Sequence, residues 1–191
     1  MILVTVGTHH QPFTRLIGAL RSLPSDELVV QYGHSPAPAW RSAWQAVPFL
    51  AYDRLAALMD ASDVVVTHAG VGSVLTALRM GHTPIVVPRL ARFGEHVDDH
   101  QAELTETLAD TGRVIAVWEM DELASALASV PPRVEARSSA SAETLHAAVR
   151  SACLGDLGDQ RPEDVQQAGN GAVELEGFGD TLPRPATELP A

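Results

Sequence analysis

The chain has 191 residues, of which 13 are basic and 24 acidic, so its formal net charge is −11. Such an acidic chain repels phosphate backbones and anionic lipid surfaces, which argues against binding of nucleic acid and against direct adsorption to a membrane. Every basic residue is arginine, and the absence of lysine excludes a Walker-type phosphate loop, a Schiff base and a lysine general base. The single Cys153 has no partner for an internal disulfide, which suits a reducing compartment.

Charge and composition change near residue 150. Residues 1–150 carry 11 Arg and 16 acidic residues, whereas residues 151–191 carry 2 Arg and 8 acidic residues among many Gly and Pro. We expect one domain over 1–150 and a disordered acidic tail over 151–191, because the tail shows neither helical nor strand periodicity. The start lacks a signal peptide and no run reaches the ~18 apolar residues of a membrane span, so we expect a cytoplasmic chain that begins near Met1.

Short β-branched runs alternate with helical stretches along residues 1–150. Most runs are apolar throughout, which is typical of strands covered on both faces. The expected strands are Met1–Val6, Glu27–Tyr32, Val47–Leu50, Asp63–Thr67, Thr83–Val87 and Arg113–Val117. The expected helices are Pro12–Ser22, Asp53–Ala61, Ser73–Met80, Val97–Ala109 and Asp121–Ser129, with one more over Val134–Val149. This order predicts an α/β fold with a doubly wound parallel sheet, Rossmann-like, whose ligands bind beyond the carboxyl ends of the strands.

The strand that is expected to end at Thr67 runs into a turn of small residues. Gly70 and Gly72 let a ligand approach the backbone, and Ser73 is placed to start a helix whose free N–H groups face the carboxyl edge of the sheet. Helix N-termini attract anions, so the turn predicts an anion site, most simply for a diphosphate. An ordinary turn with Ser73 as N-cap explains the same glycines, and His68 is also compatible with a satisfied interior histidine.

Polar side chains also gather after the next strand, between Arg89 and Gln101. Such a cluster at the carboxyl edge can hydrogen-bond a polyhydroxylated ligand, with Gln101 offering donors and acceptors together. His96, Asp99 and His100 stand at spacing that metal ligands also use. No further ligand is evident and a solvated helix entry explains the same residues, so we expect no metal and no cofactor.

Three segments in order resemble the donor-binding half of the family 28 glycosyltransferases. They are Thr67–Ser73, Gly81–Arg89 and Gly94–Gln101, and the opening Val4–Thr8 is similar to the start of the stand-alone, PssE-like form of that half. This form is the small catalytic subunit of a two-chain transferase in polysaccharide or glycan synthesis. The resemblance covers about residues 1–130 and implies the C-terminal, Rossmann-like half of a GT-B fold that holds a UDP-sugar.

The same resemblance assigns residues to the diphosphate of the donor. His68 and the turn before the helix would cradle it, with Ser73 and Val74 contributing main-chain N–H groups. Thr8, in the loop after the first strand, would approach from across the cleft. The residues implied here are Thr8, His68, Gly72, Ser73 and Val74.

Further residues are implied for the remaining parts of the donor. Phe49 and Leu50 match the family segment beside the uracil, and His100 and Gln101 match the position that contacts sugar hydroxyls. Thr76 departs from the family, which usually carries a Glu whose carboxylate takes both ribose hydroxyls. Loss of such a bidentate contact could cost about 1–3 kcal/mol. Ribose binding therefore depends on whether another residue compensates.

The resemblance further implies inverting transfer of the sugar to a lipid-linked acceptor without a metal. His68 would stabilise the leaving phosphate together with the helix N-terminus. The base and the acceptor site belong to the other half of the cleft, so we expect a membrane-anchored partner that recruits the chain to the inner face of the membrane. His9 and His10 are the local candidates for a base, although adjacent histidines before a helix also fit a solvent-facing role.

Two other functions have to be weighed against the sequence. Thr76 would also fit a non-catalytic subunit that binds nucleotide sugars and regulates a transferase. An epimerase related to the GT-B group would need both halves of the cleft in one chain and acid and base groups that the sequence does not offer. Mutation of His68 or Gln101 in a reconstituted pair distinguishes a catalytic subunit from a regulatory one, because only a catalytic subunit should then lose transfer rate.

Overall fold

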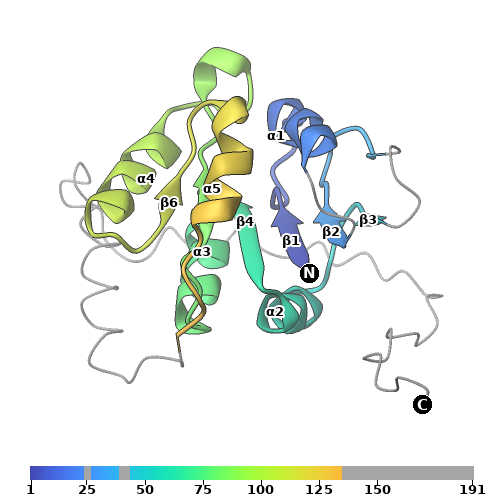
Figure 1. Cartoon of the computed structure of the whole chain (residues 1–191). Coiled ribbons are helices and arrows are strands. Elements are labelled where there is room, and N and C mark those ends of the chain that lie inside the picture. Colours follow the sequence, from blue (N-terminus) through green and yellow to red (C-terminus); the bar gives the residue numbers. More distant parts are fainter. Residues whose placement is uncertain (24–26, 39–43, 135–191) are drawn as a thin grey trace, which may run out of the picture. The chain divides into compact units, whose positions relative to one another are not determined.

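The computed structural model describes residues 1–23, 27–38 and 44–134. In this part the strands form one parallel sheet in the order β3-β2-β1-β4-β5-β6 (Figure 1). The strands are β1 (Ile2–Thr5), β2 (Leu28–Gln31), β3 (Gln45–Val47), β4 (Val64–His68), β5 (Ile85–Val87) and β6 (Ile115–Ala116). The helices are α1 (Thr14–Ala19), α2 (Tyr52–Ala61), α3 (Val71–Arg79), α4 (His100–Asp110) and α5 (Leu123–Ser129), with short 3₁₀ turns η1 (Leu20–Ser22), η2 (Ala91–Phe93) and η3 (Met120–Glu122). The predicted doubly wound parallel sheet is confirmed.

Strand order reverses at the centre of the sheet. The chain builds β1, β2 and β3 outward in one direction, then returns to place β4 on the other side of β1. In register, Val4 of β1 lies beside Val30 of β2 and Val66 of β4. The loops after β1 and β4 therefore leave the same edge in opposite directions and open a crevice between them, which is where such sheets bind ligands.

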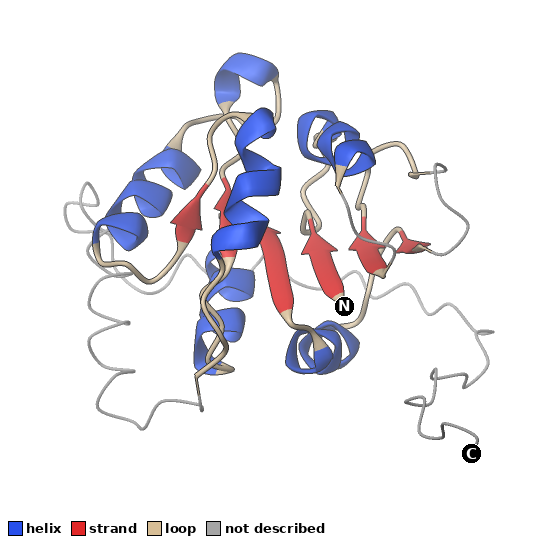
Figure 2. Cartoon of the chain, viewed as in Figure 1, coloured by secondary structure: helices blue, strands red, loops and turns tan. Residues whose placement is uncertain are grey.

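The two faces of the sheet are covered by different helices (Figure 2). Alternate side chains of the central strands, Val4 and Val66 among them, pack with α1 and α5 in one buried cluster. Their neighbours Leu3 and Val65 pack with α2 and α3 on the opposite face, and a third cluster joins α3 to α4. Burial on both faces explains why the strands are apolar throughout rather than alternating.

Most element boundaries differ from the predicted ones by a few residues, and three of these differences lie near the carboxyl edge of the sheet. β3 ends at Val47 because Pro48 has no N–H to continue a ladder, and its carbonyl accepts the Gly33 N–H at 2.8 Å. α3 begins at Val71, with Gly70 rather than Ser73 as its N-cap. α4 begins at His100, because Asp99 accepts the Ala91 N–H at 2.9 Å and so belongs to the preceding loop.

The predicted helix over 134–149 lies outside the described residues except for Val134, whose N–H donates to the Gly81 carbonyl at 3.1 Å. The predicted tail over 151–191 lies wholly outside them. Among the helices of the described part, none combines the length and apolar character required to span a membrane.

Candidate functional site

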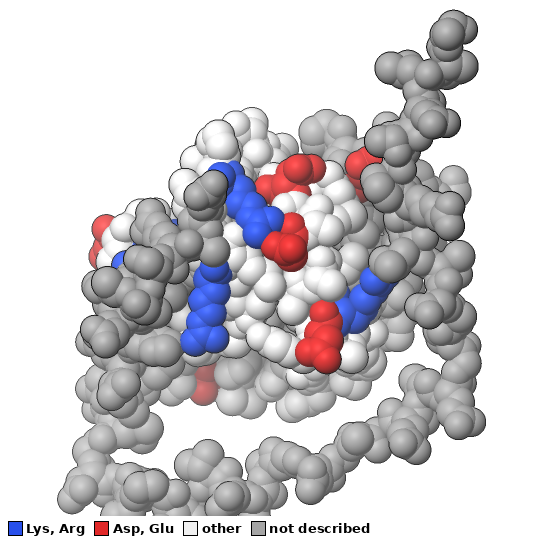
Figure 3. Space-filling model, turned by 90° about the horizontal axis from the view of Figure 1, so that it is seen from below, with Lys and Arg blue, Asp and Glu red and all other residues white. Residues whose placement is uncertain are grey.

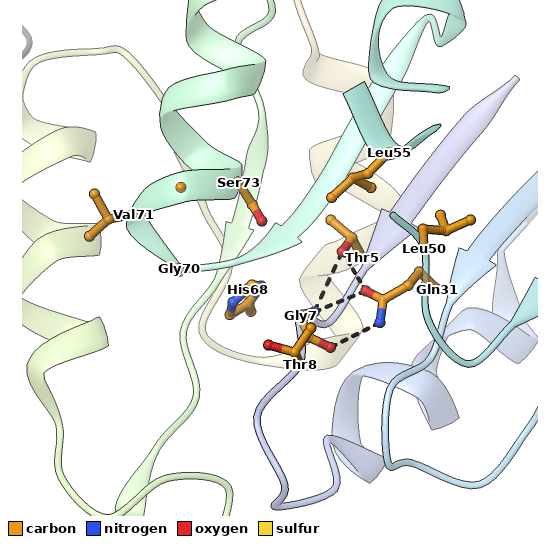
Figure 4. Close-up of a pocket in the computed structure, with 11 residues that line it drawn as sticks. Thr5, Gly7, Thr8, Gln31, Leu50, Leu55, His68, Gly70, Val71 and Ser73 are labelled. Carbon is orange, nitrogen blue, oxygen red and sulfur yellow. Dashed lines mark hydrogen bonds between the residues drawn. The ribbon is translucent and has the colours of Figure 1, made fainter. Parts of the chain in front are cut away.

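A pocket of about 200 Å³ opens where the loops after β1 and β4 diverge (Figure 4). One wall is the first turn of α3, the opposite wall is the segment that leads into α2, and the floor is the ends of β1, β2 and β4. The lining residues are Thr5, Gly7, Thr8, Gln31, Leu50, Leu55, His68, Gly70, Val71, Gly72 and Ser73. We call it the switch-point pocket. It unites segments between residues 5 and 73 that a parallel sheet brings to one edge.

His68 is the last residue of β4, and its ring is held between two glycines. A Cβ at Gly7 would lie 2.5 Å from Cε1 of the ring, and a Cβ at Gly70 would lie 2.2 Å from Nε2. Both distances are too short for any side chain, so the glycines are required by the imidazole. Gly7 also adopts φ +74°, which favours glycine independently. The sequence pattern identified Gly70 as a place for a ligand, whereas the structure shows that it first makes room for His68.

The His68 imidazole is neutral in the folded protein at physiological pH. The ring is 9% exposed, and burial lowers its pKa to about 4, with the positive charge of Arg89 acting in the same direction. A neutral imidazole has one N–H donor and one acceptor nitrogen. Nδ1 lies 3.5 Å from the Thr67 hydroxyl. A backbone hydrogen bond with Thr5 acts to raise this pKa, and the neutral ring can donate to an anion only in the tautomer whose proton lies on the nitrogen that faces the pocket.

The turn after β1 is fixed by Gln31, a buried polar residue that the sequence analysis missed. Its Oε1 accepts the Thr5 hydroxyl at 2.6 Å and the Gly7 N–H at 3.1 Å, and its Nε2 donates to the carbonyls of Gly7 at 2.9 Å and Pro48 at 2.8 Å. These bonds join the ends of β1, β2 and β3 and hold the Gly7 turn against His68. A glutamine at the end of an otherwise apolar strand was the available signal.

The first turn of α3 presents unused backbone donors to the pocket. In the described part of the chain, the N–H groups of Gly72 and Ser73 have no hydrogen-bond acceptor, because the first helical bond runs from the Val74 N–H to the Gly70 carbonyl at 3.1 Å. The Val74 N–H, which was expected to bind the diphosphate, is therefore already used within the helix. The two free N–H groups are those of Gly72 and Ser73. In Figure 4 the Ser73 hydroxyl also turns toward the pocket. Free amides and a helix N-terminus together favour an anion.

The wall opposite α3 is apolar. Leu50 and Leu55 line the pocket, and Thr8 lies at its outer end, as Figure 4 shows. Phe49 is 45% exposed and does not line the pocket, and its ring meets His34 edge-on with 5.0 Å between centroids. The structure thus places Thr8 and Leu50 at the pocket and Phe49 on the adjoining surface.

Thr76 lies one turn into α3, outside the lining of the pocket. Its hydroxyl donates to the Gly72 carbonyl at 2.8 Å, so its one proton is used within the helix. The Tyr52 hydroxyl lies 3.4 Å from the hydroxyl oxygen of Thr76, although the Tyr52 side chain is 65% exposed. Thr76 therefore offers a bound ligand only the remaining lone pair of its oxygen.

A buried ionic network supports the loop after β5. Arg89, 1% exposed, donates to the carbonyls of Val6 at 2.8 Å and Gln11 at 2.8 Å, and so ties this loop to the loop after β1. Arg15 holds the Glu95 carboxylate through two bonds of 3.0 Å. Arg89 is thus a structural residue that joins the loops after β1 and β5.

The polar residues after β5 do not form one cluster in the structure. The Oε1 of Gln101 accepts the Arg89 N–H at 3.1 Å, which leaves its amide nitrogen for a ligand. The His100 side chain is 77% exposed beside Asp98. His9 stacks on His96 with 4.6 Å between ring centroids. In the described residues, no group of three or more His, Cys, Asp or Glu side chains is arranged to hold a metal ion.

Comparison with known proteins identifies the family. The model of the "Glycosyltransferase family 28 C-terminal domain" matches residues 1–152. The chain belongs to this family. The resemblance noted in the sequence is confirmed, and family membership extends over the whole part of the chain that the structure describes.

One curated protein and two solved structures are similar to this chain. The "UDP-N-acetylglucosamine transferase subunit ALG13" of Yarrowia lipolytica is 34% identical over 137 residues, which cover 64% of this chain and 67% of that protein. An NMR structure of ALG13 superposes with a TM-score of 0.51 at 17% identity, over 75% of this chain and 93% of that one, and supports the fold. The crystal structure of the glycosyltransferase SnogD from Streptomyces nogalater has a TM-score of 0.49 at 18% identity over 80% of this chain. The chain spans only 39% of SnogD.

Proposed function

We propose that the chain is the donor-binding catalytic subunit of an inverting, metal-independent glycosyltransferase. It would bind a UDP-sugar in the switch-point pocket and transfer the sugar to a lipid-linked acceptor in polysaccharide or glycan synthesis. The observation that carries the proposal is the neutral, buried His68 beside the free amides of Gly72 and Ser73. The ALG13 relative, a subunit of a UDP-N-acetylglucosamine transferase, supports the choice of a uridine donor.

The chemistry of the pocket suits a departing phosphate. When the glycosidic bond of the donor breaks, its electron pair stays on the diphosphate, which gains negative charge. The amides of Gly72 and Ser73 and a ring N–H of His68 would then stabilise that charge in a partly dehydrated site, which would replace a metal ion. Removal of one such donor typically costs about 10²–10³ in rate.

The proposal includes a second subunit that is anchored to the membrane and binds the acceptor. Support comes from the family, whose matching model is a C-terminal domain, and from the ALG13 relative, which is itself a subunit. The partner would hold this chain at the cytoplasmic face of the membrane. A genome in which a neighbouring reading frame encodes an N-terminal anchor and a Rossmann-like half would fit this arrangement.

Calorimetry of the full chain tests the donor assignment. UDP, UDP-glucose, UDP-galactose, UDP-glucuronate and UDP-N-acetylglucosamine are titrated with and without EDTA, with ADP as a comparison. At least one uridine ligand should bind equally well in EDTA, and His68→Gln should weaken it by about tenfold or more, equivalent to about 1.4 kcal/mol. The control is Gly18→Ala, because nothing lies within 4 Å of a Cβ at that position in α1. If no uridine nucleotide binds, the proposal is wrong.

A second candidate function is a non-catalytic, regulatory subunit that binds nucleotide sugars. The observation that favours it is the Thr76 hydroxyl, which is spent on the Gly72 carbonyl and gives a nucleotide little to bind. In a reconstituted pair, His68→Gln and Gln101→Ala distinguish the two functions. A fall in the transfer rate supports the catalytic subunit, and an unchanged rate supports the regulatory one.

A further inference from the structure

Gln31 lines the switch-point pocket, although its side chain has no hydrogen-bonding capacity left for a ligand. It is 3% exposed. Its Oε1 accepts two hydrogen bonds and its Nε2 donates two, which is the full capacity of a carboxamide. Both partners of Nε2 are carbonyl oxygens, which can only accept, so the orientation of the carboxamide is fixed. Gln31 therefore acts on the backbone around the pocket and not on a ligand directly.

The hydrogen bonds of Gln31 reach two sides of the pocket. On one side, Gly7 is bound through its N–H at 3.1 Å and through its carbonyl at 2.9 Å, and the same turn packs against the His68 ring. On the other side, the Pro48 carbonyl is bound at 2.8 Å and lies two residues before Leu50, which lines the apolar wall. One side chain thus connects the turn beside His68 with the segment that leads into α2.

Residues 48–50 form hydrogen bonds through a single carbonyl in the described part of the chain. The N–H groups of the two residues after Pro48 have no acceptor there, and proline itself has no N–H. The Pro48 carbonyl accepts the Gly33 N–H at 2.8 Å in addition to the Gln31 amide. Of these two donors, Gln31 is the one that also binds the turn after β1. The position of the apolar wall relative to that turn therefore depends on Gln31.

We propose that Gln31 is a positioning residue for the donor, which holds the two sides of the switch-point pocket at the separation that a nucleoside diphosphate requires. The inference rests on the proposed function, in which the base lies against Leu50 and the diphosphate lies between His68 and the first turn of α3. A ligand that contacts both sides at once gains its full affinity only if the separation is set before it binds, because otherwise binding must also order the two sides. Gln31 removes this ordering cost through its bonds to both.

The test compares one ligand that reaches both sides with two ligands that each reach one side. UDP, uridine and inorganic pyrophosphate are titrated into the full chain, UDP by calorimetry and the two weaker fragments by chemical-shift titration. Gln31→Met removes all four hydrogen bonds, while it keeps the length of the side chain and its lack of charge. Gln45→Met is the matched control, because it makes the same substitution at an exposed position of the neighbouring strand β3. Urea unfolding shows whether each variant is folded under the conditions of the titrations.

Without Gln31, each side of the pocket should still form, because the free amides of α3 and the apolar residues of the opposite wall remain in place. We therefore expect Gln31→Met to bind UDP at least about tenfold more weakly than the wild type, with the affinities for uridine and pyrophosphate each within about twofold. Gln45→Met should bind all three ligands within about twofold of the wild type. A residue that only stabilises the fold would leave the UDP affinity of the folded variant unchanged.

A second variant moves the same turn without changing Gln31. Gly33→Ala places a Cβ 2.9 Å from the Gly7 carbonyl oxygen, and Gly33 has φ +57°, so the methyl group should push the turn away. It should give the same pattern, a loss for UDP that exceeds the losses for the two fragments.

The outcomes separate this inference from the proposed function. UDP binding by Gln31→Met within about twofold of the wild type would overturn the inference and leave the proposed function intact. Equal losses for UDP and for one fragment would show a role on one side only, and would overturn it as well. The same holds if neither variant folds, or if the wild type binds UDP but neither fragment. A wild-type chain that does not bind UDP would instead contradict the proposed function.

Discussion

Two buried imidazoles lie at opposite edges of the sheet, and their surroundings differ. His68 ends β4 at the carboxyl edge, and His82 precedes β5 at the amino edge. Both have a lowered pKa because of burial. Nε2 of His82 lies 2.8 Å from the Met59 carbonyl and so donates to the backbone. His68 instead lines a pocket between two glycines.

This difference distinguishes a histidine with a structural role from a histidine that lines a candidate ligand pocket. At the amino edge the ring donates to the Met59 carbonyl, which also accepts the Ser62 N–H at 3.2 Å, so the ring fixes the end of α2. At the carboxyl edge the structure makes room for a ring whose polar atoms face a space for a ligand. Burial and a lowered pKa are therefore insufficient to identify a functional histidine. The backbone around the ring has to be considered as well, because it determines whether the ring faces a pocket.

Replacement of Arg89 should have the largest effect on stability. Arg89→Met would leave the carbonyls of Val6, Gln11 and Glu95 without their donors, because Arg89 now bonds all three. Unpaired buried acceptors cost about 1–3 kcal/mol each, so we expect a loss of at least about 3 kcal/mol in urea unfolding. Arg92→Met is the control, since the Arg92 side chain is 61% exposed. Equal stability of the two variants would contradict the structural role given to Arg89.

A methyl group at Gly70 should damage both the fold and the pocket. Gly70→Ala places a carbon 2.2 Å from Nε2 of His68 and must displace the buried ring. We expect about 2–3 kcal/mol of destabilisation and a UDP affinity at least about tenfold lower. Gly72→Ala is the informative comparison, because nothing lies within 4 Å of its Cβ. It should fold at least as stably as the wild type, yet weaken UDP, since the methyl group enters the proposed anion site.

The stability of the protein should fall as the pH drops from about 6.5 toward 4. A neutral His68 in the folded state and a protonated one in the unfolded state mean that unfolding takes up a proton in this range. The contribution of His68 is complete above pH 6.5 and has lost about 2 kcal/mol at pH 5. The destabilisation caused by His68→Asn should therefore shrink by about 2 kcal/mol between pH 7.5 and 5, as urea unfolding would show. Parallel pH curves for wild type and variant would contradict the lowered pKa of His68.

The parallel sheet could be predicted from the sequence because each strand is a short apolar run followed by a helix with its own periodicity. The candidate anion site could also be predicted, since Gly70, Gly72 and Ser73 follow a strand directly. The fit of His68 between Gly7 and Gly70 could not be predicted, because the two glycines lie in loops after different strands, and only the fold shows that these strands are adjacent. Likewise, Asp99 and His100 were considered with His96 as metal ligands by spacing, whereas the structure pairs His96 with Asp98. Side-chain direction in an irregular loop does not follow any sequence period.

A change at the amino edge should have the smallest effect and should leave ligand binding untouched. On this face, arginine and carboxylate side chains lie beside one another rather than gathering into a basic patch (Figure 3). Arg133 is among the residues at this edge, where it donates to the carbonyls of Met80 and Asp60 and pairs with the Asp60 carboxylate. The pair is solvent-exposed, so Arg133→Ala should cost about 1 kcal/mol or less, and less still at high salt.

The same variant tests the comparison between the two edges. The charge of Arg133 lowers the pKa of His82, whereas the charge of Asp60 raises it, and burial outweighs both. Arg133→Ala should therefore raise the pKa of His82 while burial still opposes its charged form, and should leave UDP affinity within about twofold of the wild type, measured by the same calorimetry. A clear loss of UDP binding would mean that the amino edge is coupled to the pocket through β4 and β5. The division between a histidine for the fold and a histidine for the site would then no longer hold.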